Sequence, residues 1–172
     1  MHSKYALFSI LAMSIVSTTF AQDSAFKLLS PAFANGGIIP TQYTCSGADT
    51  SPPLAWVDVP RGTKSLVLIV DDPDAPGGTF VHWVVYELDS TTNRLAENAS
   101  NSASRTQGVN GFGHLGYGGP CPPRGAPHDY HFRLFALASP LGLKPGASAS
   151  EVLSAVKGRV LGTAELVGIF GR

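Results

Sequence analysis

Three carboxylates crowd one short bend, DDPDAPGG at residues 71–78, and a histidine follows at position 82. Proline, glycine and self-bonding Asp side chains build such bends, so turn formation accounts for two of the three carboxylates. The third needs a positive or hydrogen-bonding partner, because neighbouring like charges repel. His82 stands among apolar residues and also needs a partner or a task. Strand alternation predicts Phe80, His82, Val84 and Tyr86 on one face.

A second polar group follows a glycine- and proline-rich loop in GYGGPCPPRGAPHDYHFRLFAL, residues 116–137. Alternation places His128 and Tyr130 on one face of the ensuing strand, and Asp129 and His131 on the other. The glycines at 116, 118 and 119 leave backbone N–H groups free to converge on an anion, since no Cβ blocks the approach. The alternative is an ordinary long loop, with Tyr130 and His131 as half-buried residues of the strand.

Strands must position His82 and His128. Val, Ile and aromatic runs favour strands at residues 66–70, 79–88 and 130–138, and more weakly at 26–29, 54–57 and 160–170. Ser148 and Glu151 have the spacing of a helix capping box, and Gly158 is suited to end that helix. We therefore expect a mostly β protein: an antiparallel β-sandwich with one or two short helices, one of them near the C-terminus.

The first residues are interpreted as a secretory signal peptide, residues 1–21, followed by one domain, residues 22–172. Lys4 precedes the uncharged apolar stretch Tyr5–Phe20, and Thr19-Phe20-Ala21 has small residues at the positions typical of cleavage. The alternative is an N-terminal membrane anchor, although a span needs about 20 strongly apolar residues. The signal predicts a periplasmic or secreted protein with no membrane span in its mature form.

Charge excludes some partners. The chain has 12 basic and 12 acidic side chains, and loss of Lys4 with the signal leaves a formal net charge of −1. There is no basic excess for binding nucleic acid. The two cysteines, Cys45 and Cys121, would meet an oxidising compartment after export, where a disulfide can form. Two buried thiols are the alternative, and two cysteines alone are too few for a structural zinc site.

Three segments resemble the phosphatidylethanolamine-binding protein family, and within it the bacterial Raf-kinase-inhibitor-like branch. They are TCSG with SPPLAW at residues 44–47 and 51–56, DPDAP at 72–76 with His82, and GYGGPCPP at 116–123 with His128 and Tyr130. They follow the family's order and spacing and extend over nearly all of residues 22–172. The resemblance implies a β-sandwich with a small anion-binding pocket near one end.

The family's pocket residues correspond here to Asp72, His82, His128 and Tyr130, with Asp74 and the loop from Pro120 through Pro122 to Pro123 lining the cavity. The family usually has arginine where Asp129 stands. Alternation turns Asp129 away from the pocket, so the site should survive, whereas a role for that arginine elsewhere is in doubt.

Two imidazoles, a phenol and loop N–H groups would form a donor-rich cavity for phosphate or carboxylate oxygens. Our hypothesis is that Asp72 accepts a hydrogen bond from a histidine N–H, which fixes the tautomer and favours the imidazolium. Affinity for a phosphate mimic should then rise as pH falls through roughly 6.5, the pKa of an unperturbed imidazole.

These observations predict a non-enzymatic binding protein without a cofactor, whose ligand is a small anion such as phosphate or a phosphorylated headgroup. Inhibition or modulation of a protein partner is left open, as is a homodimer. The alternative is a hydrolase or metal-dependent enzyme that uses His82, His128 and Asp72, although no G-x-S-x-G nucleophile motif is present.

Overall fold

The computed structural model describes residues 25–101 and 106–172. The segment interpreted as a signal peptide lies outside these residues.

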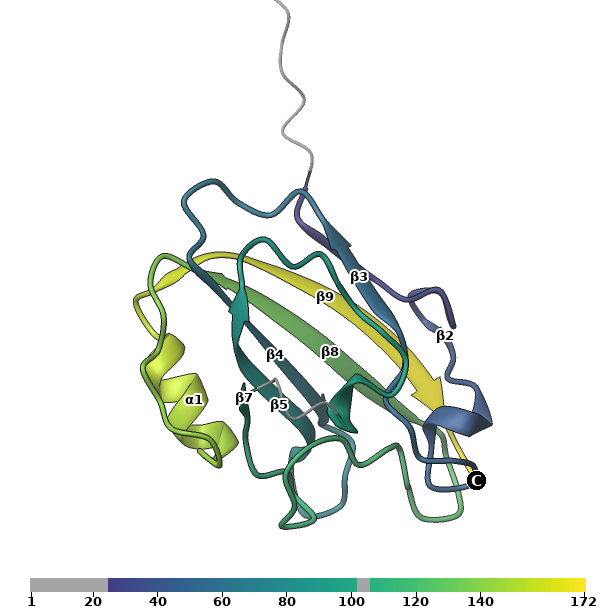
Figure 1. Cartoon of the computed structure of the whole chain (residues 1–172). Coiled ribbons are helices and arrows are strands. Elements are labelled where there is room, and N and C mark those ends of the chain that lie inside the picture. The colour runs from purple at the N-terminus through teal and green to yellow at the C-terminus, as the bar shows by residue number, and fades with distance from the viewer. Residues whose placement is uncertain (1–24, 102–105) are drawn as a thin grey trace, which may run out of the picture.

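Six strands form the larger sheet, in the order β2-β9-β8-β4-β5-β7 (Figure 1). Their bounds are β2 Gly37–Ile38, β4 Ser65–Asp72, β5 Phe80–Asp89, β7 Thr106–Gln107, β8 His128–Leu137 and β9 Val160–Phe170. Neighbouring strands are antiparallel except β2 and β9, which are parallel. Every residue of β4 is buried, as expected for a central strand that is covered on both faces.

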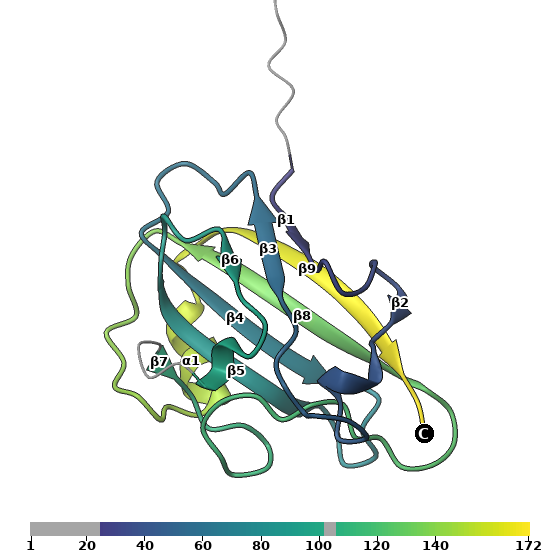
Figure 2. The ribbon, with the colours of Figure 1, turned by 45° about the vertical axis from the view of Figure 1, so that its right-hand side comes forward.

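Three short strands form a smaller sheet, β1-β3-β6, across one face of the larger one. They are β1 Lys27–Leu29, β3 Leu54–Val57 and β6 Arg94–Leu95. Between the two sheets lies the main core, which includes Leu28, Trp56, Trp83, Phe132 and Leu166. Figure 2 shows β1, β3 and β6 in front of the long strands and the helix behind them.

The opposite face of the larger sheet is covered in part by α1, Ala149–Val156. Val152 and Val156 of the helix join Ile69 and Val84 of the sheet in a second buried cluster. The predicted capping box is present: the Ser148 side chain accepts from the Glu151 N–H, and the Glu151 side chain accepts from the Ser148 N–H. Two short 3-10 helices, η1 Thr41–Tyr43 and η2 Ala99–Asn101, lie in the connections.

The expected fold class is confirmed. All six strand segments expected from the sequence form strands, and the single α-helix of the described residues lies near the C-terminus. The strands β2, β6 and β7 were not expected, because two residues are too short to show a period.

Candidate functional site

A β-bulge places His82. Val70 of β4 pairs with Trp83 of β5, but Asp71 pairs with Val81, so His82 is an extra residue without a partner on β4. The bulge turns His82 toward Tyr130 on the core side, with ring centroids 5.2 Å apart.

The same bulge contradicts the expected alternation along this strand. Val84 and Tyr86 belong to the cluster beneath α1 rather than to the face of His82. An inserted residue reverses the alternation from that point on, and such bulges often re-aim a side chain near a functional site.

Strand β8 brings the second histidine to the same place. His128 and Tyr130 are buried and Asp129 is exposed, as alternation predicted. His131 lies on the opposite face, where its Nδ1 is 2.8 Å from the Glu165 carboxylate.

His128 and Asp72 are hydrogen-bonded to each other. The Nδ1 of His128 lies 2.8 Å from Asp72 Oδ2, and the two residues are 8% and 3% exposed. The other carboxylate oxygen, Oδ1, accepts from the Asp74 N–H at 2.8 Å. Asp72 therefore has a histidine partner of the kind expected, and that partner is His128 on β8 rather than His82 beyond the bend.

The three carboxylates of the bend have three different partners. Asp71 pairs with Arg133 on the helix-side face of the sheet, and Asp72 pairs with His128. Asp74 Oδ2 accepts from the Asp129 N–H at 2.9 Å, which joins the bend to the start of β8. Each charge is thus satisfied, as close carboxylates require.

His82 has a neutral partner. Its Nδ1 lies 2.6 Å from the carbonyl oxygen of Gly118, and the residue is only 3% exposed. Because a carbonyl only accepts, Nδ1 carries the proton and Nε2 is the nitrogen that titrates. Burial lowers the pKa of His82, and the Gly118 hydrogen bond and the negative charge of Asp72 oppose that shift.

Tyr130 lies fully buried next to both imidazoles, with ring centroids 5.2 Å from His82 and 6.5 Å from His128. Its hydroxyl has no hydrogen-bond partner among the described residues. Burial and the nearby charge of Asp72 raise its pKa strongly, so the phenol stays protonated and remains a donor.

A cavity of about 190 Å³, which we name the histidine pocket, opens beside these groups. It is lined by Asp72, Ala75, Pro76, Phe80, His82, Phe112, Cys121, Pro122, Pro123 and His128. The structure therefore brings together four of the predicted ligand-binding residues: Asp72, His82, Pro122 and His128.

Three predicted residues do not line the cavity. Asp74 instead accepts the hydrogen bond from the Asp129 N–H at the start of β8. Pro120 is buried, and its carbonyl accepts from the Cys45 N–H at 3.1 Å. Tyr130 lies beside the imidazoles, but it is not part of the lining.

The cavity also has aromatic walls that sequence reasoning missed. Phe80 and Phe112 contact each other edge to face, with centroids 4.7 Å apart, and both contact His82. Phe80 is two residues before His82, so alternation gave a signal for it. Phe112 lies in a glycine-rich loop and is 45% exposed, and nothing in the local sequence marks it.

The expected cradle of glycine N–H groups is wrong at two positions. The Gly118 N–H donates to the His82 carbonyl at 3.0 Å, and the Gly119 N–H donates to Asp49 Oδ1 at 2.7 Å. Both donors are used within the protein and are not available to an anion.

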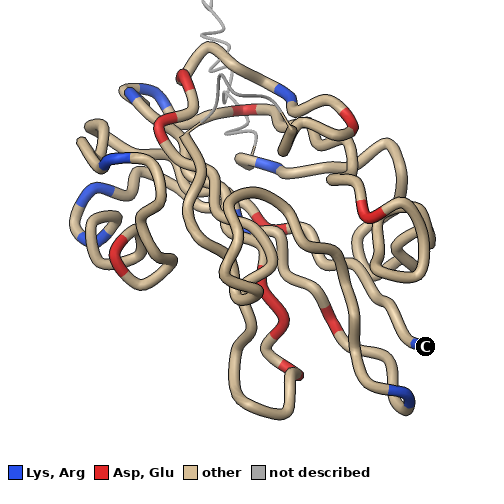
Figure 3. The backbone as a smooth tube through the Cα atoms, turned by 60° about the horizontal axis from the view of Figure 1, so that its bottom comes forward, with Lys and Arg blue, Asp and Glu red and all other residues tan. Residues whose placement is uncertain are grey.

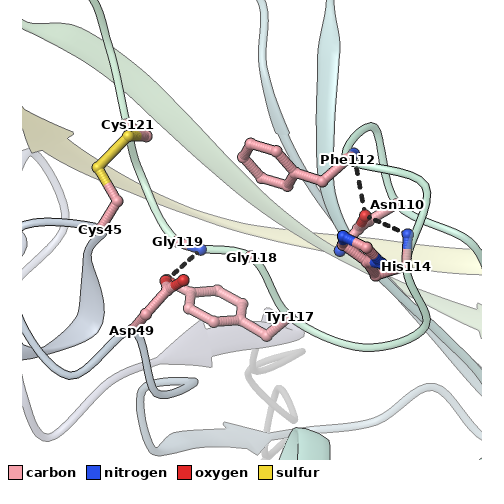
Figure 4. A pocket seen from close by; sticks show the side chains of 9 residues that line it. All are labelled: Cys45, Asp49, Asn110, Phe112, His114, Tyr117, Gly118, Gly119 and Cys121. Atoms are coloured by element: carbon pink, nitrogen blue, oxygen red, sulfur yellow. Dashed lines mark hydrogen bonds between the residues drawn. A yellow bond between two sulfur atoms is a disulfide. The ribbon is translucent and has the colours of Figure 1, made fainter.

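A second cavity of about 270 Å³, the disulfide pocket, adjoins the first and shares Phe112 and Cys121 with it. Figure 4 shows its lining, including the disulfide between Cys45 and Cys121 and the hydrogen bond from Gly119 to Asp49. The disulfide ties the loop before β8 to the segment that follows η1.

Lys and Arg residues lie at several separate places along the described chain, as do Asp and Glu residues (Figure 3). Within the same residues, no group of three or more His, Cys, Asp or Glu side chains could hold a metal ion. No helix of the described segments is long and apolar enough to span a membrane.

Comparison with known proteins places the chain. The family model described as phosphatidylethanolamine-binding protein matches residues 29–171. The chain belongs to the phosphatidylethanolamine-binding protein family. A UPF0098 protein of Aquifex aeolicus is 49% identical over 157 residues, which cover 88% of this chain and 92% of the relative. One of Methanothermobacter thermautotrophicus is 48% identical over 150 residues, with coverage of 85% and 99%.

Two solved structures of similar proteins share the fold. A putative phosphatidylethanolamine-binding protein homolog from Chlamydia trachomatis, CT736, has a TM-score of 0.81 at 43% identity and covers 86% of this chain and 98% of its own. E. coli YbcL, described as a new member of the mammalian family, has a TM-score of 0.81 at 32% identity and covers 87% and 99%. The family resemblance expected from the three motifs is therefore confirmed.

Proposed function

We propose that this protein is a non-enzymatic binding protein whose histidine pocket takes a small anion, a phosphate or a phosphorylated headgroup. The observation that carries the proposal is the pairing of His128 with Asp72 next to His82 at one apolar-walled cavity. Family membership supports it, since the family is named for a phospholipid ligand.

A carboxylate inside an anion pocket needs an explanation, and its hydrogen bonds supply one. Both oxygens of Asp72 accept from protein donors, the His128 imidazole and the Asp74 N–H. The carboxylate thus offsets the charge of a protonated His128 rather than confronting the ligand. Proline and phenylalanine side chains make the walls largely apolar, and a surrounding of low polarity strengthens the hydrogen bonds made within it.

Binding should be coupled to proton uptake. Nδ1 of each histidine is already bonded to protein, so Nε2 is the remaining nitrogen. A neutral imidazole of this tautomer presents a lone pair at Nε2, which repels an anion, whereas an imidazolium donates from it. Calorimetric titration with sulfate in two buffers of different ionisation enthalpy would count the protons. Sulfate suits this test because its own charge is constant between about pH 5 and pH 8.

The binding test is calorimetry with phosphate, acetate and phosphoethanolamine on wild type, His128→Ala and His131→Ala. A charge-assisted hydrogen bond contributes about 1.5–3 kcal/mol, so His128→Ala should weaken binding roughly ten- to a hundredfold. His131→Ala is the matched control, because it removes an imidazole from the other face of the same strand. Equal affinity in wild type and His128→Ala would overturn the proposal. Turnover of phosphoesters by wild type that is lost in His128→Ala would show an enzyme instead.

We further propose a periplasmic or secreted location, with the rim of the pocket as the contact surface for a protein partner. The apolar stretch before residue 22 supports the location, and the exposed side chain of Phe112, which lines the cavity, supports the contact surface. Cell fractionation tests the location, and light scattering after size exclusion tests for a homodimer.

A further inference from the structure

One peptide unit, between Gly118 and Gly119, lines the disulfide pocket and is hydrogen-bonded on both sides. Its carbonyl oxygen lies 2.6 Å from His82 Nδ1. Its N–H donates to Asp49 Oδ1 at 2.7 Å, as Figure 4 shows. Asp49 therefore contacts the peptide that contacts His82, although Asp49 itself does not line the histidine pocket.

A chain of hydrogen bonds polarises its members. A carboxylate that accepts from a peptide N–H draws negative charge toward the carbonyl oxygen of the same peptide, and that oxygen becomes a better acceptor. The better acceptor favours a proton on His82 Nδ1 and also stabilises the imidazolium. The carboxylate also prevents the flexible Gly-Gly peptide from flipping, which would present an N–H to the imidazole.

We propose that Asp49 is a positioning residue for His82, acting through the Gly118–Gly119 peptide to hold the Nδ1–H tautomer and to keep Nε2 as the nitrogen that takes up a proton. The two histidines are then positioned in the same way. Nδ1–H of His128 donates directly to a carboxylate. Nδ1–H of His82 donates to a peptide carbonyl, and the N–H of that peptide donates to a carboxylate. The consequence for anion affinity rests on the proposed function, whereas the statement about His82 does not.

The local geometry leaves little room for another arrangement. A Cβ at position 119 would lie 2.5 Å from both Asp49 Oδ1 and the Tyr43 carbonyl oxygen. Asp49 itself has a φ of 55°, a left-handed conformation that Asp tolerates better than most residues. Glycine at 119 and aspartate at 49 thus allow the Asp49 carboxylate to approach the Gly119 N–H closely.

The loop is held by several contacts that do not involve Asp49. Cys45 is bonded to Cys121, the Cys45 N–H donates to the Pro120 carbonyl, and the Tyr117 hydroxyl donates to the Tyr43 carbonyl at 2.7 Å. Replacing Asp49 should therefore leave the loop in place. The tautomer of His82 then reports on the effect carried by the peptide, whereas the titration midpoint also includes the direct attraction of the Asp49 charge.

Other groups also act on His82 and must be separated from Asp49. Asp72 on β4 favours its protonation, and burial opposes it. His128 and Tyr130 on β8 lie on another side, and Phe80 and Phe112 pack against the ring. Each of these groups is unchanged when only residue 49 is replaced.

The test is NMR of the His82 ring nitrogens during a pH titration, in wild type, Asp49→Asn and Asp49→Ala. The Asp49→Asn variant keeps an acceptor for the Gly119 N–H but not the charge, so the tautomer should persist while the titration midpoint falls. Asp49→Ala removes both, so the midpoint should fall further and a fraction of Nε2–H tautomer should appear. Sulfate affinity near the midpoint should fall about two- to fivefold, the range for a partly screened charge.

Asp58→Asn is the matched control, because Asp58 is another exposed aspartate with a left-handed φ, 56°. It should leave His82 unchanged. The proposal is overturned if Asp49→Asn and Asp49→Ala titrate like wild type, or if Asp58→Asn shifts His82 equally. The NMR measurement needs no ligand. If the protein bound no anion, the proposed function would be refuted, and the titration of His82 would still decide the role of Asp49.

Discussion

His82 and His128 show how two identical side chains acquire different properties. His128 donates to a carboxylate, whereas His82 donates to a carbonyl in a nearly closed environment. Burial dominates at His82 and lowers its pKa. The difference arises from partners that are distant in the sequence, Asp72 for one ring and Gly118 for the other.

The lowered pKa of His82 predicts a pH dependence of folding. In the unfolded chain this imidazole has its ordinary pKa of 6.5, so the unfolded state binds the proton first as pH falls. The free energy of unfolding should therefore decrease below about pH 6.5, until the lower pKa of the folded state is passed. Urea unfolding of wild type and His82→Gln at several pH values would measure this, since the variant lacks that contribution. A constant difference between the two proteins across the range would contradict it.

Gly119 predicts a second effect at single-residue scale. Gly119→Ala places a methyl group 2.5 Å from the Asp49 and Tyr43 oxygens, and such overpacking destabilises a protein by about 1–3 kcal/mol. Gly77→Ala, next to Pro76 of the histidine pocket, meets no atom within 4 Å and should change stability by at most about 1 kcal/mol, in the stabilising direction. Denaturant midpoints of the two variants test this, and similar midpoints would contradict it.

Residue types and motifs in the sequence were enough to nominate Asp72, His82, Pro122 and His128. They could not show which histidine Asp72 would bind, because that choice depends on the pairing of β8 with β4. They also could not show that the glycine N–H groups were already engaged. The partner of Gly119 is Asp49, 70 residues earlier in the chain, and no local pattern links the two.

At the scale of elements, the bulge in β5 is the feature that makes the site. Without it, one strand could not direct both His82 and Trp83 to the core side and Val84 to the helix side. The period of two predicted the strand itself, since the alternation holds between this bulge and a second register shift, between Val85 and Leu88. It could not locate the extra residue, because an apolar run that is buried on both faces has no polar positions to mark a change of phase.

The helix cap makes a prediction at this scale. Ser148→Ala removes the acceptor for the Glu151 N–H and breaks the capping box, which should destabilise the protein by about 1 kcal/mol. Ser154→Ala, on an exposed position of the same helix, should have little effect or be slightly stabilising, because alanine has the higher helix propensity. Thermal unfolding of both variants tests this prediction. Equal losses of stability in the two variants would exclude a stabilising role for the cap.

At the scale of the whole molecule, the disulfide closes a loop between residues 76 apart in sequence. Limiting the unfolded chain in this way is expected to contribute about 4–5 kcal/mol. Cys45→Ser with Cys121→Ser should therefore lower the free energy of unfolding by about that amount under oxidising conditions. Under reducing conditions, the difference between this variant and wild type should disappear. A variant as stable as oxidised wild type would contradict this account.

The overall sandwich was predictable because its long strands and its helix have strong local signals, such as the LVLIV run at residues 66–70 and the capping box. The place of Phe112 in the wall of the histidine pocket was not predictable from the sequence. An exposed aromatic residue becomes part of such a wall only when its loop folds back over β5. The motif resemblance supplied what periodicity could not, namely that the two histidines meet.

The topology also sets the order in which the pocket can assemble during folding. Strands β4 and β5 form a local hairpin, but His128 is 56 residues from Asp72 along the chain, and contacts of such long range form at a high entropic cost. The two imidazoles thus meet only after β8 has docked. An anion held between them would stabilise contacts made late, so it should slow unfolding and leave the rate of refolding nearly unchanged.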